Sequence, residues 1–160
     1  MKGRIIGAGI AACLALATPC VSYYEGMVPR TYADPVGIPT ICYGHTGGDV
    51  TAERTATDSE CAALLNGDLR MAMQGVLQCV QIDLTPNQAA ALVSFAYNVG
   101  VPALCRSTLA RLANTGAAPE EWCAQLNRWT YATKFGQSIQ LPGLVKRRAA
   151  ETALCLGTST

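Results

Sequence analysis

Twenty consecutive uncharged residues near the N-terminus constrain this chain more than any other feature. They run from Ile5 to Tyr24, directly after Lys2 and Arg4, and as a helix they would be about 30 Å long. That length matches the apolar interior of a bilayer, but seven of the twenty are Ala or Gly, so insertion would be marginal. We therefore do not expect a permanent membrane anchor.

Three interpretations of this segment stay open: a cleaved signal peptide, an uncleaved anchor that can leave the membrane, and an ordinary buried first helix. The residues Ala15-Leu16-Ala17 fit an A-x-A cleavage site. The cysteine count favours retention, since cleavage after Ala17 would remove Cys13 and leave seven cysteines, an odd number.

Eight cysteines in 160 residues indicate an oxidising compartment and therefore export. They are spread along the chain without a C-x-x-C pair, which favours disulfides over a metal cluster. Cys61 and Cys79 lie at the two ends of one predicted helix, about 27 Å apart, and cannot bond to each other. The other pairings stay open. The formal charge of +1 provides no overall field for nucleic acid, so we expect no nucleic-acid partner.

Start and stop signals divide the rest of the chain into a short β region and a series of helices. Thr18 and Pro19 predict a helix start, with Glu25 in the last turn before Gly26. Residues 26–50 are rich in Gly, Pro, Thr and Tyr and predict a β-hairpin region. Further helices are predicted from Thr57 to Cys79, from Thr85 to Gly100, from Ser107, from Pro119, and from Pro142 to near Gly157.

These elements predict one domain with an α+β fold that is mainly α. The run 89–99 is apolar nearly all round and predicts the central core helix. A small β-hairpin lobe would stand beside a helical lobe. The cleft between two such lobes is the natural position of a site.

Polar residues suited to acid and base chemistry lie close together around the predicted hairpin, namely Glu25, Asp34, Thr40 and His45. One carboxyl in an apolar setting can stay protonated and donate to a leaving oxygen, while an ionised carboxyl orients water. The helix end and the apolar neighbours Tyr24 and Met27 would disfavour an ionised Glu25. Spacing alone nevertheless favours solvated surface charges, because two acids nine residues apart are common.

The exact residues of this segment favour a catalytic role over solvated surface charges. The spacing Glu25-x8-Asp34-x5-Thr40 resembles the catalytic triad pattern of the phage lysozymes, or endolysins, of glycoside hydrolase family 24. The resemblance covers residues 20–156 and implies a two-lobed lysozyme fold that cuts the β-1,4 bond between N-acetylmuramic acid and N-acetylglucosamine in peptidoglycan. The matching segments are Glu25-Gly26, Tyr32-x-Asp34, Gly37-Ile38-Pro39-Thr40, Gly44-His45-Thr46-Gly47, Thr85-x-Asn87-Gln88, Leu92 to Gly100, Ser107-Thr108-Leu109, Leu141-Pro142-Gly143-Leu144 and Arg147-Arg148.

The resemblance implies a role for each residue of the triad. Glu25 would be the general acid, and Asp34 with Thr40 would hold the attacking water, as in an inverting enzyme. An inverting site needs carboxyl groups about 6.5 to 9.5 Å apart. Peptidoglycan would be the substrate partner of a monomer without cofactor or metal, and the expected substrate-binding residues are His45, Asn98 and Ser107. Two alternatives are a catalytically silent cell-wall-binding module of the same fold and a lytic transglycosylase.

Other side chains have two interpretations each. His45, the only histidine, is expected to tie hairpin to helix rather than to bind a metal. The run 146–148 (Lys-Arg-Arg) would either meet anionic cell-wall polymers or form a solvated helix face. Trp122, Trp129 and Tyr131 would either line a sugar subsite or belong to the core.

The resemblance also gives the apolar segment a role. The chain looks like the signal-arrest-release endolysins, which are exported, held inactive in the inner membrane and then released into the periplasm. Residues 1–22 would be the signal-arrest-release or signal-peptide-like segment, with transient inner-membrane association, and residues 18–160 the lysozyme-like catalytic domain. Release would make Cys13 and Cys20 available for disulfide formation or exchange with a thiol such as Cys42.

Overall fold

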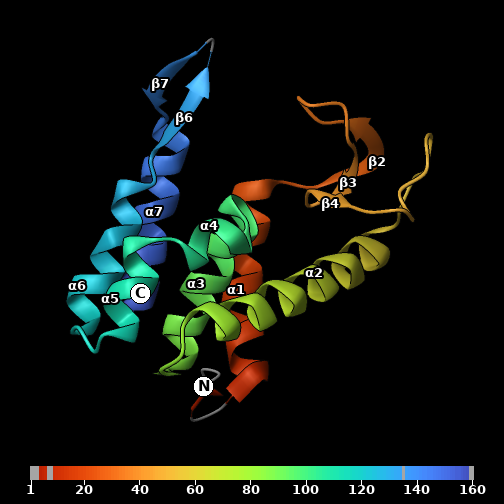
Figure 1. Ribbon diagram of the computed structural model, residues 1–160. Coiled ribbons are helices and arrows are strands. Elements are labelled where there is room, and N and C mark those ends of the chain that lie inside the picture. Colours follow the sequence, from red (N-terminus) through yellow and green to blue (C-terminus); the bar gives the residue numbers. More distant parts are fainter. Residues whose placement is uncertain (1–3, 7–8, 135, 159–160) are drawn as a thin grey trace.

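A computed structural model describes residues 4–6, 9–134 and 136–158, and most of them are helical. Figure 1 shows a body of packed helices from which α2 runs out to a small separate sheet. The α-helices are α1 (Gly9–Glu25), α2 (Asp58–Cys79), α3 (Pro86–Val99), α4 (Val101–Cys105), α5 (Thr108–Asn114), α6 (Pro119–Ala124) and α7 (Pro142–Cys155), and η1 (Gln125–Arg128) is a 3-10 helix.

The strands form three small sheets, of which one belongs to the predicted hairpin region. There β2 (Val28–Ala33), β3 (Pro39–Cys42) and β4 (His45–Thr46) pair antiparallel in that order. The predicted fold class, α+β and mainly α, is confirmed. The other strands are β1 (Arg4–Ile5) parallel to β5 (Asp83–Leu84), and β6 (Tyr131–Lys134) antiparallel to β7 (Gln137–Gln140).

The first helix is longer than predicted, and its predicted start at Thr18 is wrong. Helix α1 begins at Gly9, and the Thr18 hydroxyl is used inside the helix, where it donates to the Leu14 carbonyl at 2.7 Å. Pro19 lies on the exposed side of the helix, as does Ala15, whose carbonyl group has no N–H partner at Pro19. The helix does end at Glu25 as predicted, with Gly26 at φ +70°. Within the described residues, no helix is both long and apolar enough to span a membrane.

The core forms around α3, as predicted. All residues from Ala89 to Ala96 are buried, and α1, α2 and α7 pack against this helix. The helix starts where predicted, because Thr85 and Gln88 form a complete capping box. A second capping box starts α2, between Thr57 and Glu60. Near the C-terminal end of α2, Gly75 allows α4 to approach closely, since a side-chain carbon there would meet Val101 at 2.4 Å.

Six of the eight cysteines form disulfides. They join β3 to α2 (Cys42–Cys61), α2 to α4 (Cys79–Cys105) and α6 to α7 (Cys123–Cys155). The prediction that Cys61 and Cys79 do not pair with each other is therefore confirmed. Cys13 and Cys20, both in α1, are free thiols. The argument from an even cysteine count thus fails, because loss of Cys13 would leave every disulfide intact.

Candidate active site

Glu25 lies where the helical body meets the small sheet. It is the last residue of α1, and its side chain is 23% exposed. Its Oε1 accepts a hydrogen bond from Arg147 Nη1 at 2.5 Å. On the sheet side, a side-chain carbon added to Gly44 would lie 3.8 Å from Oε2. The carboxyl group is therefore held by α7 and faces the turn between β3 and β4.

A pocket of about 430 Å³ opens beside this carboxyl group. It is formed where α1 and α3 end and where α7 begins. Asn98 belongs to it, so the structure brings this predicted substrate-binding residue together with Glu25. The lining residues are Tyr24, Glu25, Asn98, Leu141, Pro142, Gly143, Leu144 and Arg147.

Asp34 and Thr40 are brought together by the turn that joins β2 to β3. Asp34 Oδ1 accepts hydrogen bonds from the backbone N–H groups of Val36 and Ile38 at 2.9 and 2.8 Å. The Thr40 hydroxyl, on a residue that is 4% exposed, donates to the Ile38 carbonyl at 2.9 Å. Both side chains are thus hydrogen-bonded to the backbone of Ile38. The turn holds Oδ1 of Asp34 in place.

His45 connects the small sheet to α2, as expected. Its Nδ1 is 2.8 Å from Asp68 Oδ2, and its Nε2 is 3.2 Å from Asp49 Oδ1. Burial lowers the pKa of His45, but the hydrogen bonds and charges of Asp68 and Asp49 outweigh burial and raise it above its usual value. The protonated ring can donate to both carboxylates and fasten β4 to the helix.

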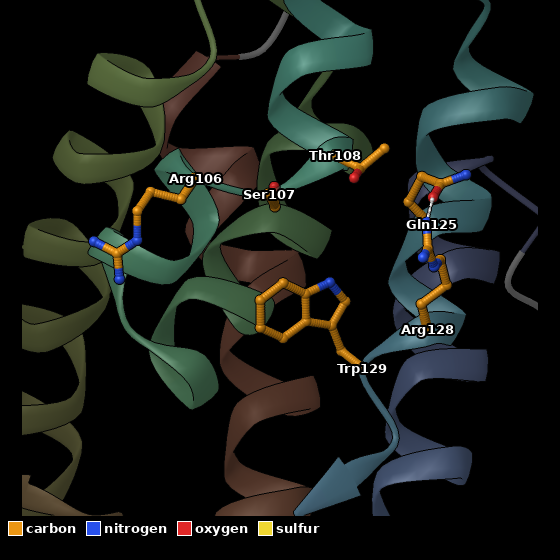
Figure 2. A pocket seen from close by; sticks show the side chains of 6 residues that line it. All are labelled: Arg106, Ser107, Thr108, Gln125, Arg128 and Trp129. Carbon is orange, nitrogen blue, oxygen red and sulfur yellow. Dashed lines mark hydrogen bonds between the residues drawn. The ribbon is translucent and has the colours of Figure 1, made fainter.

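Ser107 lies in a different pocket, of about 280 Å³, in the helical body. Its hydroxyl caps α5, since it accepts from the Ala110 N–H at 3.0 Å and donates to the Leu104 carbonyl at 2.7 Å. Figure 2 shows the Trp129 ring below Ser107 and Thr108, with Gln125 and Arg128 to the right and Arg106 pointing away from the other five side chains. The pocket lining is Arg106, Ser107, Thr108, Gln125, Arg128 and Trp129.

The three aromatic residues singled out in the sequence have different environments. Trp122 is 1% exposed and belongs to the core. Trp129 is half-buried, packs edge to face on Phe95 with ring centres 5.2 Å apart, and lines the Ser107 pocket. Tyr131 lies in β6 and is 58% exposed.

The two arginines of the basic run in α7 form neither a solvated face nor a surface for anionic polymers, so both interpretations are wrong for Arg147 and Arg148. Lys146 is exposed, but Arg147 and Arg148 are 3% and 0% exposed. The reason is Glu151, which lies three and four residues further along the same helix. Arg147 Nε donates to Glu151 Oε1 at 3.1 Å, and Arg148 Nη1 lies 2.8 Å from Glu151 Oε2.

Sequence reasoning missed this cluster, although the spacing of Glu151 from the two arginines is the signal that indicates it. Glu151 is fully buried and also accepts from the Ser94 hydroxyl at 2.7 Å. Arg148 Nη2 donates to Asn98 Oδ1. Burial raises the pKa of Glu151, while the two guanidinium groups and the Ser94 hydroxyl oppose that effect. The predicted apolar setting of Glu25 is wrong, because a guanidinium group contacts it.

A helical body with a small sheet, and a carboxyl group at their junction, define a lysozyme-like protein. Residues 22–151 match the family described as Phage lysozyme, and the chain belongs to this family. It is 42% identical over 132 residues to the SAR-endolysin of Bacteriophage PS119, which covers 82% of this chain and 76% of that protein. It is 34% identical over 160 residues to the SAR-endolysin of Pseudomonas phage phiKMV, and the match covers 100% of this chain and 93% of that protein.

Solved structures agree with this assignment and confirm the two-lobed fold. The muramidase domain of SpmX from Asticaccaulis excentricus matches with a TM-score of 0.82 at 32% identity, over 96% of this chain and 98% of that domain. The active form of the P1 phage endolysin Lyz matches with a TM-score of 0.73 at 26% identity, over 92% and 84%.

Proposed function

We propose that this protein is an endolysin muramidase that hydrolyses the β-1,4 bond between N-acetylmuramic acid and N-acetylglucosamine in peptidoglycan. The observation that carries the proposal is the position of Glu25, which lines an open pocket of the helical body and faces Gly44, in the turn of the small sheet region that holds Asp34 and Thr40. Membership of the phage lysozyme family supports the same conclusion.

In the proposed reaction Glu25 gives its proton to the glycosidic oxygen as the C1–O bond breaks. Asp34 takes a proton from a water molecule, whose oxygen attacks C1 from the opposite face and inverts the configuration. The hydrogen bonds support these roles. Asp34 is oriented by two backbone N–H groups on Oδ1, and the Thr40 hydroxyl, which donates to Ile38, keeps its lone pairs to accept from the same water.

Substrate contacts are proposed for two places. Asn98 lines the Glu25 pocket and would meet the sugar next to the bond that is cut. The Ser107 pocket supplies hydrogen-bond donors from Arg128 and Thr108, and no carboxylate lines it. It suits the carbonyl and carboxylate groups of a stem peptide. His45 would act indirectly, since its ring nitrogens are occupied by Asp68 and Asp49.

The N-terminal segment is proposed to hold the enzyme in the inner membrane before releasing it as a periplasmic monomer. The relatives named SAR-endolysin support this proposal. So does the position of Glu25 at the end of α1, because a helix inside the bilayer cannot pack on α3 or bring Glu25 to Arg147. Residues 1–3 and 7–8 of the segment lie outside the described residues.

Glu25→Gln tests the proposal, because the amide cannot protonate the leaving oxygen. We expect a folded protein that no longer clears a suspension of permeabilised Gram-negative cells. Full activity of this variant would remove Glu25 from the mechanism. Mass spectrometry of the wild-type products separates the alternatives, because a lytic transglycosylase leaves anhydro-sugar ends and a silent binding module leaves the glycan uncut.

A further inference from the structure

Glu151 occupies the centre of a buried charge cluster that ends at Glu25. It is fully buried in α7, one helical turn after Arg147. One carboxylate oxygen accepts from Arg147 Nε and the Ser94 hydroxyl, and the other faces Arg148. Arg147 reaches from this carboxylate to Glu25, and its Nη2 also donates to the Ser94 carbonyl at 3.1 Å.

The cluster holds two guanidinium groups and two carboxyl groups. With all four ionised its formal charge is zero, and protonation of Glu25 changes it to +1. Without Glu151, an ionised Glu25 would leave the cluster at +1 and a protonated Glu25 would leave it at +2. A guanidinium neighbour favours the ionised form of a carboxyl group, yet a general acid must carry its proton when the substrate is bound. An uncompensated Arg147–Arg148 pair would therefore oppose the reaction.

We propose that Glu151 is a positioning residue that offsets the charge of Arg147 and Arg148, so that Arg147 can orient Glu25 without preventing its protonation. This inference rests on the proposed role of Glu25 as the general acid. Arg147 fixes one oxygen of Glu25, and Glu151 determines how strongly the guanidinium charge acts there. The cluster thus separates orientation of the acid from its ionisation.

Three other titratable groups near Glu25 carry little charge at neutral pH. On α1, burial raises the pKa of the Tyr24 phenol and the Cys20 thiol, and on α3 it raises the pKa of Tyr97. These three groups are neutral near pH 7. Asp68 on α2 is paired with His45. Asp34, on the small sheet that Glu25 faces, is unchanged in every variant of the test that follows. The charges that the cluster itself brings to Glu25 are those of Arg147, Arg148 and Glu151.

The test is the pH dependence of kcat in the Glu151→Gln variant. The amide keeps the size of the side chain and an acceptor oxygen for Ser94 but removes the negative charge. We expect the alkaline limb of the profile, where the general acid loses its proton, to move to lower pH by about one unit. The matched control is Ser94→Ala, which removes a hydrogen bond to Glu151 and no charge, and its alkaline limb should coincide with that of the wild type.

A double variant distinguishes charge compensation from a purely structural role. Glu151→Gln with Arg148→Gln removes one charge of each sign, so its alkaline limb should return towards the wild-type position although two buried residues have changed. A purely structural role predicts no such return. If Glu151→Gln does not fold, Arg148→Gln alone decides, because the limb should then move to higher pH.

Two results would overturn the inference: an unmoved limb in folded Glu151→Gln, or an unmoved limb in Arg148→Gln. Neither result touches the proposed function, which fails only if Glu25→Gln keeps its hydrolytic activity. The two proposals can therefore fail separately.

Discussion

Arg147 Nη1 lies 2.5 Å from Oε1 of Glu25, although the two residues are 122 positions apart in the chain. The ion pair joins the last residue of α1 to the first half of α7. Arg147 is also bound to Glu151 and to the Ser94 carbonyl, so its position is set by α7 and α3 independently of α1. The helical body therefore holds a preformed cationic receptor for the carboxyl group that α1 brings.

Replacing Arg147 should lower the free energy of unfolding strongly, whereas replacing its neighbour Lys146 should not. Arg147→Met removes the guanidinium partner of Glu25 and one of the two guanidinium groups that face the buried Glu151, and we expect the free energy of unfolding to fall by about 3 to 5 kcal/mol. Lys146→Met, one residue earlier and exposed, is the matched control and should change it by less than about 0.5 kcal/mol. Urea unfolding of both variants measures the difference. Equal stabilities would show that the Arg147 ion pairs contribute nothing.

The two residues proposed to hold water should differ in their effect on turnover. Asp34→Ala removes the proton acceptor, and we expect kcat to fall by about 10²- to 10⁴-fold. Thr40→Ala removes only a positioning contact, so a loss of roughly tenfold is expected. Thr46→Ala, on the exposed residue opposite Thr40 in β4, controls for damage to the sheet. A Thr40→Ala enzyme with the full rate would remove Thr40 from the mechanism.

The sheet should be held to α2 more weakly at high pH. Because the pKa of His45 is raised above 6.5 in the folded protein, its stabilising effect is complete below about pH 6.5 and is lost as the pH rises through the folded-state pKa. We expect the wild type to lose roughly 1 kcal/mol over this range. His45→Gln should lack this loss, as measured by urea unfolding at several pH values. Asp83→Asn, which breaks the exposed ion pair with Arg4, should keep it.

Thiol labelling should find two reactive cysteines in the denatured, unreduced protein. These are Cys13 and Cys20, and a variant with both replaced by Ser should not be labelled. Reductant should lower the melting temperature, since each structural disulfide typically contributes ~2 to 4 kcal/mol. Labelling of all eight cysteines would contradict the disulfides. Exchange of Cys20 with Cys42 would require the Cys20 thiolate to attack Cys42 Sγ and displace Cys61 as the leaving thiolate.

Increasing the apolar character of the N-terminal segment should trap the enzyme in the membrane. The sequence suggests Leu at Gly7, Gly9, Ala11 and Ala12, but Gly7 lies outside the described residues and Gly9 has φ +72°, which disfavours a side chain. Ala11 and Ala15 are exposed in α1, so Leu at these two positions favours insertion without disturbing the packing on α3.

We expect the Leu variant to stay in the membrane fraction and to delay lysis, with Ser at both positions as the control. If the Leu variant is instead trimmed by a protease and lyses cells on the wild-type schedule, the segment is a cleaved signal peptide.

Elements that depend on local signals could be predicted from the sequence. The capping boxes at Thr57 and Thr85 and the Ser107 cap act over three residues, and each starts a helix where predicted. The start of α1 could not be found in this way, because burial of Cys13 to Val21 against other helices overrides the local cap signal at Thr18.

In the candidate site, too, local contacts could be predicted from the sequence and contacts between remote residues could not. Asp34 and Thr40 lie in one turn, so their proximity follows from the local sequence. The contact of Arg147 with Glu25 could not be predicted, because the two residues are remote in the chain and no local pattern indicates it. The separation of the Ser107 pocket from the Glu25 pocket likewise depends on how α3, α4 and η1 pack.

The disulfides leave α1 without a covalent link to the rest of the molecule except through the chain itself, because all six bonded cysteines lie between Cys42 and Cys155. Helix α1 therefore binds the rest of the molecule as an intramolecular ligand would. Only the residues between Glu25 and Cys42 tether it to the disulfide-bonded part. How strongly α1 is retained on α3 therefore depends on an effective concentration set by that tether, and on any environment that competes for the helix. Separation of α1 from the oxidised body would require no covalent bond to be broken.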